Sequence, residues 1–334
     1  MQSIPIRSFA YAELTRKAKN TWKLTYLFLF LLSYPALRQC AQAQAIGGGQ
    51  IQGTITDANG SVVSGATIEA VQKESGLHRT VTSSGDGGYN LPDLPVGPYQ
   101  LNVSAQGFSS YQQSGIVIEV GNNLRVDVKL QVGAVSQSVQ VTAGASMVQT
   151  EDQSISQVID RQRTVDLPLN GRQATQLILL TPGAQVAPSG DLVGTKNYPS
   201  SIAYSIAGAQ ATNTNYLMDG ADNNDAFTNV NLPFPFPDAL QEFSVQTSGL
   251  SAQYGLHPGG VVNIVTRSGT NGFHGTVFDF FRNGDLNAKN YFSTKQDSLK
   301  RNQFGGAVGG PIRRDKLFFL VATREPGPGR APTL

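Results

Sequence analysis

The chain has 334 residues, of which 40% are hydrophobic and only 14% charged, against about 25% charged residues in an ordinary soluble domain. Its 36 glycines and 17 prolines exclude long helical bundles, because each costs about 1 or 3 kcal/mol in a helix interior. Six of the 25 Lys and Arg residues but only one of the 23 acids lie in the first 45 residues, so the remainder is slightly acidic. Nucleic acid is therefore not expected as a partner, because its phosphates require a basic surface.

Catalytic and metal-binding residue types are scarce. A single cysteine, Cys40, excludes a disulfide framework and a cysteine-based zinc cluster. The three histidines are scattered, and the acidic stretch 219–225 lacks the spacing of a calcium-binding EF-hand loop. No nucleophile–base pair and no phosphate-binding loop is found. We therefore expect no enzymatic activity, no resident metal and no cofactor.

Residues 1–45 are predicted to be a secretory signal peptide. A basic segment at 16–23 precedes a continuous apolar run at 24–32, and two A-x-A cleavage sites follow at 41–43 and 43–45. The alternative is an uncleaved membrane anchor, but the run is shorter than the roughly 20 residues that a spanning helix needs. We expect the mature chain to be exported to the periplasm or the outer membrane.

Residues 46–133 alternate strand and turn signals. The segment 51–56 places apolar and polar residues on opposite faces, as a half-buried strand does. Asp57-Ala58-Asn59-Gly60 is a turn sequence. Further strands are expected at 66–71, 77–82, 99–104, 116–120 and 124–132. Many short strands at this spacing predict a β-sandwich.

Two stretches of this sandwich, GTITDANGSVVSGATI at 53–68 and GDGGYNLPDLPVGPYQL at 85–101, resemble the carboxypeptidase regulatory-like domain. That family has a transthyretin-like sandwich, also grouped with carbohydrate-binding-like folds. Peptidase activity is not implied, because a zinc peptidase needs several ligands and a base and His78 stands alone. Two roles are open for its aromatic residues: they either fill the core or stack on a sugar ring. These residues are Tyr89, Tyr99, Phe108 and Tyr111.

Residues 134–149 are predicted to be a linker. Within them, one segment resembles a TonB box, the extended peptide that a periplasmic energy-coupling protein captures by strand addition. Its alternative interpretation is the last strand of the sandwich. The candidate box consists of Gln137, Ser138, Val139, Gln140, Val141, Thr142 and Ala143.

Residues 150–272 are predicted to be a small α/β domain. LPLNGR at 167–172 is a turn in which Asn170 is expected to cap a helix over 172–180. Together with YLMDG at 216–220, LQEFSV at 240–245 and GGVVNIVTR at 259–267, it resembles the plug of TonB-dependent outer-membrane receptors, specifically the Oar-like type with an N-terminal regulatory-like sandwich. The proline-rich segment 231–237 is interpreted as an apical, ligand-facing loop.

Residues 273–322 are predicted to be the first strands of a transmembrane β-barrel. Strands are expected at 276–282, 303–312 and 317–322, with apolar and polar residues alternating. In the family these open a 22-stranded barrel. The tail at 323–334 loses the alternation, so we expect a truncated barrel that does not transport alone.

The predicted fold is mainly β: a transthyretin-like or carbohydrate-binding-like β-sandwich, a small α/β plug, and the opening strands of an incomplete transmembrane barrel. The resemblance implies a TonB-dependent receptor in the cell outer membrane, with TonB as partner and an extracellular nutrient as ligand, such as a siderophore, glycan, vitamin or peptide. The alternative is a periplasmic or surface binding module that keeps the sandwich and plug without transport.

Overall fold

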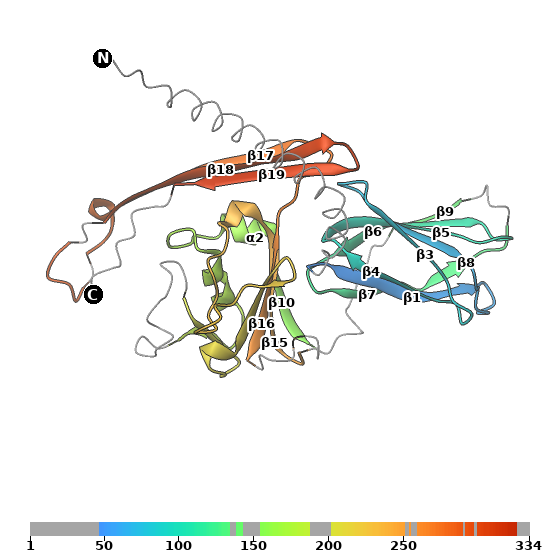
Figure 1. Cartoon of the computed structure of the whole chain (residues 1–334), viewed down its shortest axis with the longest axis horizontal. Coiled ribbons are helices and arrows are strands. Elements are labelled where there is room, and N and C mark those ends of the chain that lie inside the picture. Colours follow the sequence, from blue (N-terminus) through green and yellow to red (C-terminus); the bar gives the residue numbers. More distant parts are fainter. Residues whose placement is uncertain are drawn as a thin grey trace, which may run out of the picture. The chain divides into compact units, whose positions relative to one another are not determined.

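A computed structural model of the chain describes residues 47–133, 138–142, 154–187, 202–250, 254, 259–289, 291–296 and 299–325. The predicted signal peptide, with both of its cleavage sites, lies outside these residues. The described part is mainly β, in three groups of strands that follow one another along the sequence (Figure 1). No helix in this part has the length and apolar character needed to cross a membrane.

The first group is the β-sandwich. In one sheet, a central strand pairs antiparallel with one neighbour and parallel with two short strands. In the other, five strands are ordered β3-β2-β5-β6-β9. The strands of the first sheet are β1 (Gly49–Asp57), β4 (Gly88–Leu94), β7 (Asn123–Arg125) and β8 (Val128–Leu130). Those of the second are β2 (Thr67–Gln72), β3 (His78–Thr82), β5 (Gly97–Ser104), β6 (Ser110–Ile118) and β9 (Ser138–Thr142).

Alternate residues of both sheets form the sandwich core. Ile51 and Ile55 of β1 are fully buried against Ile68 of β2 and Leu101 of β5, as period-2 alternation requires. The predicted strand at 124–132 is instead divided into β7 and β8. The arrangement confirms the expected sandwich.

Aromatic side chains belong to this core. Tyr89 and Tyr99 are buried, and each donates its hydroxyl to a backbone carbonyl, Tyr89 to Val126 at 2.6 Å and Tyr99 to Pro95 at 2.8 Å. Burial raises the pKa of both hydroxyl groups. The two remaining aromatic candidates also pack against the core. For Tyr89 and Tyr99, the core interpretation of these rings is confirmed.

The second group is a compact α/β unit. Its five-stranded sheet is ordered β10-β15-β16-β13-β14, with β13 and β16 parallel and the other neighbours antiparallel. A short helix and three 3-10 helices also belong to this unit. The sheet strands are β10 (Ile155–Ile159), β13 (Thr214–Met218), β14 (Ala221–Asp222), β15 (Leu240–Ser248) and β16 (Gly260–Thr266); β11 (Ala184–Val186) pairs with β12 (Tyr204–Ile206). The helices are α2 (Arg161–Asp166), η2 (Ala174–Leu180), η3 (Ala211–Asn213) and η4 (Pro237–Ala239).

The predicted helix over 172–180 is wrong in its start, its type and its cap. The structure has a 3-10 helix at Ala174–Leu180, preceded by Gln173, whose side chain makes no capping hydrogen bond. Gly171 and Arg172 both have positive φ, 76° and 54°, so the backbone turns in the left-handed region before the helix begins. The backbone of Asn170 instead makes two hydrogen bonds with the Gln176 side chain: its N–H donates to Gln176 Oε1, and its carbonyl accepts from Gln176 Nε2.

The third group is an open antiparallel sheet of three strands, β17 (His274–Asn283), β18 (Lys300–Arg313) and β19 (Leu317–Arg324). Ten residue pairs in unbroken register join β17 to β18. All three expected strands are present, each longer than the sequence pattern indicated. Three strands do not close a barrel, in agreement with the expected partial barrel.

This sheet has two chemically different faces. Val277, Phe281, Phe304, Val308 and Val321 are exposed, and strand alternation and register place them on one face. Val277 is 93% exposed. Asp279 and Asn302 are polar exceptions on the same face. The opposite face carries Phe278, Arg282, Arg301 and Gln303, which contact the α/β unit. Apolar-out alternation of this kind is what lipid requires of a barrel strand.

Candidate functional site

The candidate box is an edge strand of the sandwich. Residues 138–142 form β9 and pair parallel with β6, from Ser110 opposite Ser138 to Ser114 opposite Thr142. Gln140 is exposed. Gln137 and Ala143, the two ends of the predicted box, lie outside the described residues. The backbone therefore has the extended conformation needed for strand addition, while one of its edges is already paired.

The LPLNGR segment joins the α/β unit to the three-stranded sheet. Asn170 Oδ1 accepts hydrogen bonds from Arg282 Nη1 of β17 at 2.9 Å and from Arg301 Nη1 of β18 at 3.4 Å. The carbonyl of Gly171 accepts from Gln303 Nε2 of β18 at 3.3 Å. A Cβ at Gly171 would stand 3.2 Å from Arg301 Nη1. Glycine at 171 thus serves both the positive φ and the close approach.

Arg172 lies at the centre of this junction and is 4% exposed. Its Nη2 donates to Asp238 Oδ2 of η4 in a buried ion pair, and its Nη1 donates to the carbonyl of Val165 at 3.2 Å. The guanidinium also lies over the rings of Phe278 and Phe280 of β17, with its central carbon 5.2 and 4.4 Å from their centroids. An arginine can satisfy a carboxylate and stack on aromatic rings at once.

The β19 strand completes the set of contacts. Arg324 Nη1 donates to the carbonyl of Arg172 at 3.5 Å, and its guanidinium lies over Phe236 at 5.9 Å. The turn at 170–172 therefore contacts all three strands of the sheet. Sequence reasoning picked out LPLNGR as a motif but did not predict that its side chains would hold β17, β18 and β19.

The interpretation of 231–237 as a ligand-facing loop is wrong for its aromatic residues. Phe234 packs against the core of the α/β unit, with its ring centroid 6.0 Å from that of Tyr216. Phe236 is buried, and its ring packs 5.6 Å from that of Phe278. The prolines fix the backbone so that η4 begins at Pro237 and presents Asp238 to Arg172.

In the acidic stretch 219–225, side-chain oxygens accept hydrogen bonds from nearby backbone N–H groups and from a hydroxyl group. Asp219 accepts from the N–H and hydroxyl of Thr266, each at 2.8 Å, and Asn224 Oδ1 accepts from the N–H of Tyr216 at 2.6 Å. Within the described ranges, no three acidic, histidine or cysteine side chains gather where they would hold a metal ion. These residues shape the turn after β13.

Glu242 of β15 is a half-buried carboxylate. Burial raises its pKa to about 7, and the N–H of Val120, which donates to its Oε1, opposes part of that shift. Its protonation therefore changes near neutral pH.

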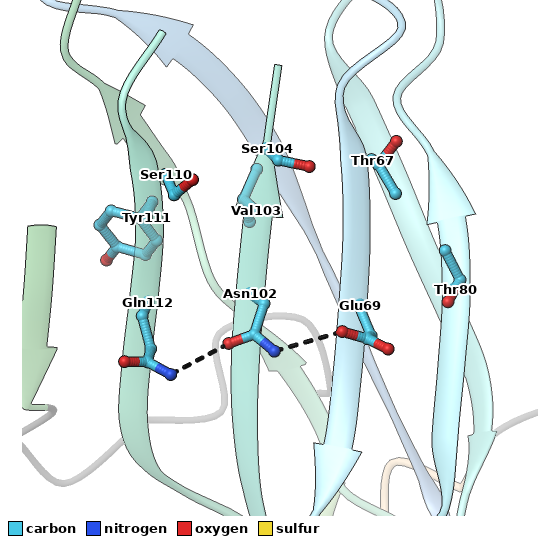
Figure 2. Close-up of a pocket in the computed structure, with 9 residues that line it drawn as sticks. All are labelled: Thr67, Glu69, Thr80, Asn102, Val103, Ser104, Ser110, Tyr111 and Gln112. Carbon is cyan, nitrogen blue, oxygen red and sulfur yellow. Dashed lines mark hydrogen bonds between the residues drawn. The ribbon is translucent and has the colours of Figure 1, made fainter. Parts of the chain in front are cut away.

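A shallow polar hollow lies on the outer face of the second sandwich sheet (Figure 2). Asn102 Nδ2 donates to Glu69 Oε2 at 3.3 Å, and Gln112 Nε2 donates to Asn102 Oδ1 at 3.4 Å. The side chains thus bond across β2, β5 and β6 (Figure 2). Tyr111 lines the hollow but packs against the core.

Comparisons with known proteins agree with this architecture. Residues 50–131 match the carboxypeptidase regulatory-like domain, and residues 265–325 match an outer membrane beta barrel domain. Two separate segments of the chain are thus similar to these two domain families. The chain is also similar to the TonB-dependent transporter Oar of Myxococcus xanthus, with 30% identity over 292 residues. The match covers 81% of this chain and 26% of that relative, so the chain spans about a quarter of its length.

Two solved structures show more distant likeness. The siderophore receptor PirA from Acinetobacter baumannii has a TM-score of 0.40 and 22% identity, covering 52% of this chain and 24% of that one. Catechol 1,2 dioxygenase from Acinetobacter radioresistens has a TM-score of 0.22 and 15% identity, covering 29% of this chain and 58% of that one. At these values neither structure bears on what this chain does.

Proposed function

We propose that this chain supplies the sandwich, the plug and the first barrel strands of a TonB-dependent outer-membrane receptor that takes up a scarce nutrient. The observation that carries the proposal is the junction at Asn170, Gly171 and Arg172. It ties the α/β unit to one face of β17–β19 while the other face is apolar. A plug held inside a barrel requires a wall with one face that contacts the plug and an opposite, apolar face that contacts lipid.

In this function the chain performs no chemistry of its own. TonB captures the segment around Gln140 by strand addition, pulls on it, and remodels the plug so that the ligand passes. Three strands leave backbone donors and acceptors unpaired at the sheet edges, which costs several kcal/mol for each group in lipid. Transport therefore needs the remaining strands of a closed barrel in addition to residues 273–322.

The orientation of the three-stranded sheet can be tested with adjacent cysteines. In a Cys40→Ser background, Val277→Cys lies on the proposed lipid face and Thr276→Cys on the plug face. Each variant of the full chain is labelled with bimane and placed in micelles that contain a brominated detergent. We expect strong quenching at position 277 and at least threefold weaker quenching at 276. Equal quenching at both positions would favour a binding module whose sheet does not face lipid.

A further inference from the structure

One end of the β-sandwich contacts both of the other groups of strands. β2 and β6 each pair antiparallel with β5, so they run in the same direction and their last residues lie at the same end of the sheet. The turn after β2, at 73–77, and the turn after β6, at 119–122, therefore project from one end of the sandwich. Only β5 separates the two strands, so the turns begin about 10 Å apart.

The turn after β6 packs on β15 of the α/β unit. The backbone N–H of Val120 donates to Glu242 Oε1. Gly121 has a positive φ of 71°, and a Cβ added to it would lie 3.4 Å from Gln246 Nε2. Val120 is 2% exposed and Gln246 is 3% exposed, so both residues are buried at this contact.

The turn after β2 contacts the three-stranded sheet. The carbonyl of Glu74 accepts from the N–H of Asn271, just before β17, at 2.9 Å. The Asn271 side chain in turn binds Asp315, in the turn between β18 and β19: Nδ2 donates to Asp315 Oδ1 at 2.7 Å, and Oδ1 accepts from the Asp315 N–H at 2.9 Å. Gly76 lies against the same residue, so closely that an added Cβ would overlap Asp315 Oδ1.

We propose that the sandwich is a brace between the α/β unit and the three-stranded sheet, and that its two turns must detach before the plug can move away from the barrel wall. The inference rests on the proposed function and assigns the sandwich a role in it. Glu74 is exposed, and a hydrogen bond in contact with water contributes little alone. Because both turns belong to one folded body, the second contact forms at a high effective concentration once the first is made. The two contacts should therefore form and open together.

Two glycines of the sandwich give a matched pair of variants. Gly76 and Gly65 have nearly equal φ values of 71° and 68°, so a Cβ strains both backbones alike. At Gly65 the added Cβ has no described atom within 4 Å, whereas at Gly76 it overlaps Asp315. Gly76→Ala and Gly65→Ala are made in the full chain in detergent micelles. Hydrogen exchange is measured by mass spectrometry on peptides that cover Val120 and on peptides that cover Asn271.

We expect Gly76→Ala to speed exchange at least about fivefold around Asn271, at its own contact, and at least about threefold around Val120, at the other contact. Gly65→Ala should change neither. Faster exchange around Asn271 with no change around Val120 would show two independent contacts and overturn the brace. Equal effects of the two variants would report backbone strain alone and would also overturn it, as would unchanged exchange at both contacts.

A second pair of variants tests the coupling from the opposite side, because coupling between two contacts is reciprocal. Glu242→Ala removes the acceptor of the Val120 N–H, whereas Glu242→Gln keeps a side-chain oxygen as acceptor. We expect Glu242→Ala to speed exchange around Asn271 at least about threefold and Glu242→Gln to leave it unchanged. No effect of Glu242→Ala around Asn271 would contradict the brace.

The bimane comparison of positions 277 and 276 tests the proposed function separately in the same chain. Uncoupled exchange at the two contacts, with the expected difference in quenching retained, would overturn the brace and leave the proposed function standing. Uncoupled exchange together with equal quenching at both positions would overturn both.

Discussion

Replacing Arg172 by methionine is the most severe test of the junction between the α/β unit and the three-stranded sheet. The substitution leaves Asp238, which is 2% exposed, without its cationic partner. Removing one member of a buried ion pair costs about 3–5 kcal/mol, because the remaining charge stays buried and uncompensated. Loss of the cation–π contacts with Phe278 and Phe280 adds about 0.5–2 kcal/mol. We therefore expect the α/β unit to lose at least about 3 kcal/mol of stability.

The matched control is Arg163→Met. Arg163 pairs with Asp160 at 3.6 Å, but both side chains are more than half exposed. Exposed pairs contribute less than about 1 kcal/mol. The double variant Arg172→Met/Asp238→Asn removes the orphaned charge, so it should recover most of the loss caused by Arg172→Met alone.

Hydrogen exchange measured by mass spectrometry suits this comparison, because a chain of several units does not unfold in two states. Opening free energies are read from peptides that cover β15 and η2 in the full chain. A loss for Arg172→Met no larger than that for Arg163→Met would refute the structural role assigned to Arg172. A double variant as unstable as Arg172→Met would also refute that role.

Three further predictions follow from other parts of the structure. The pKa of Glu242 is raised to about 7 from 4.5, so its contribution to stability falls by up to about 3 kcal/mol as pH rises from about 4.5 to 7. Hydrogen exchange of β15 should show this pH dependence in the unmodified chain and lose it in Glu242→Gln. An unchanged pH dependence in the variant would mean that another group causes it. Val308→Arg, on the apolar face, should cost about 2–4 kcal/mol in lipid and reduce membrane recovery of a receptor carrying the complete barrel, whereas recovery equal to that of Val308→Ala would contradict a lipid-facing position. The isolated fragment 47–131 should give a dispersed amide spectrum, since its strands enclose a core of their own; a random-coil spectrum would count against an autonomous sandwich.

Strand positions were predictable from sequence because apolar and polar residues alternate within each strand, which is a local pattern. Ile51, Ile55 and Leu101 alternate with polar neighbours and are all buried in the sandwich. Val277 and Phe281 alternate in the same way and are exposed on one face of β17. Period-2 patterning reports which residues share a face. It does not report whether that face meets a protein core or lipid, and the family resemblance supplied that distinction.

The junction at 170–172 was not predictable in the same way. Asn170 before a run of apolar residues is a normal helix-capping signal, yet its Oδ1 accepts from Arg282, 112 residues away. The partner of Arg172 is Asp238, and nothing local to either residue indicates the pairing. Contacts between distant segments depend on the tertiary fold, which overrides local capping preference. The consecutive positive φ values of Gly171 and Arg172 are another consequence of that fold.

The central claim is that TonB binds this chain at β9. In-cell photocrosslinking tests it most directly: a photoreactive residue replaces Gln140 of β9, and the control replaces Thr80 of β3, the strand at the opposite end of the same sheet. We expect a TonB adduct from position 140 and none from position 80, with the adduct absent from a strain that lacks TonB. No TonB adduct from position 140, or adducts of equal yield from both positions, would contradict it.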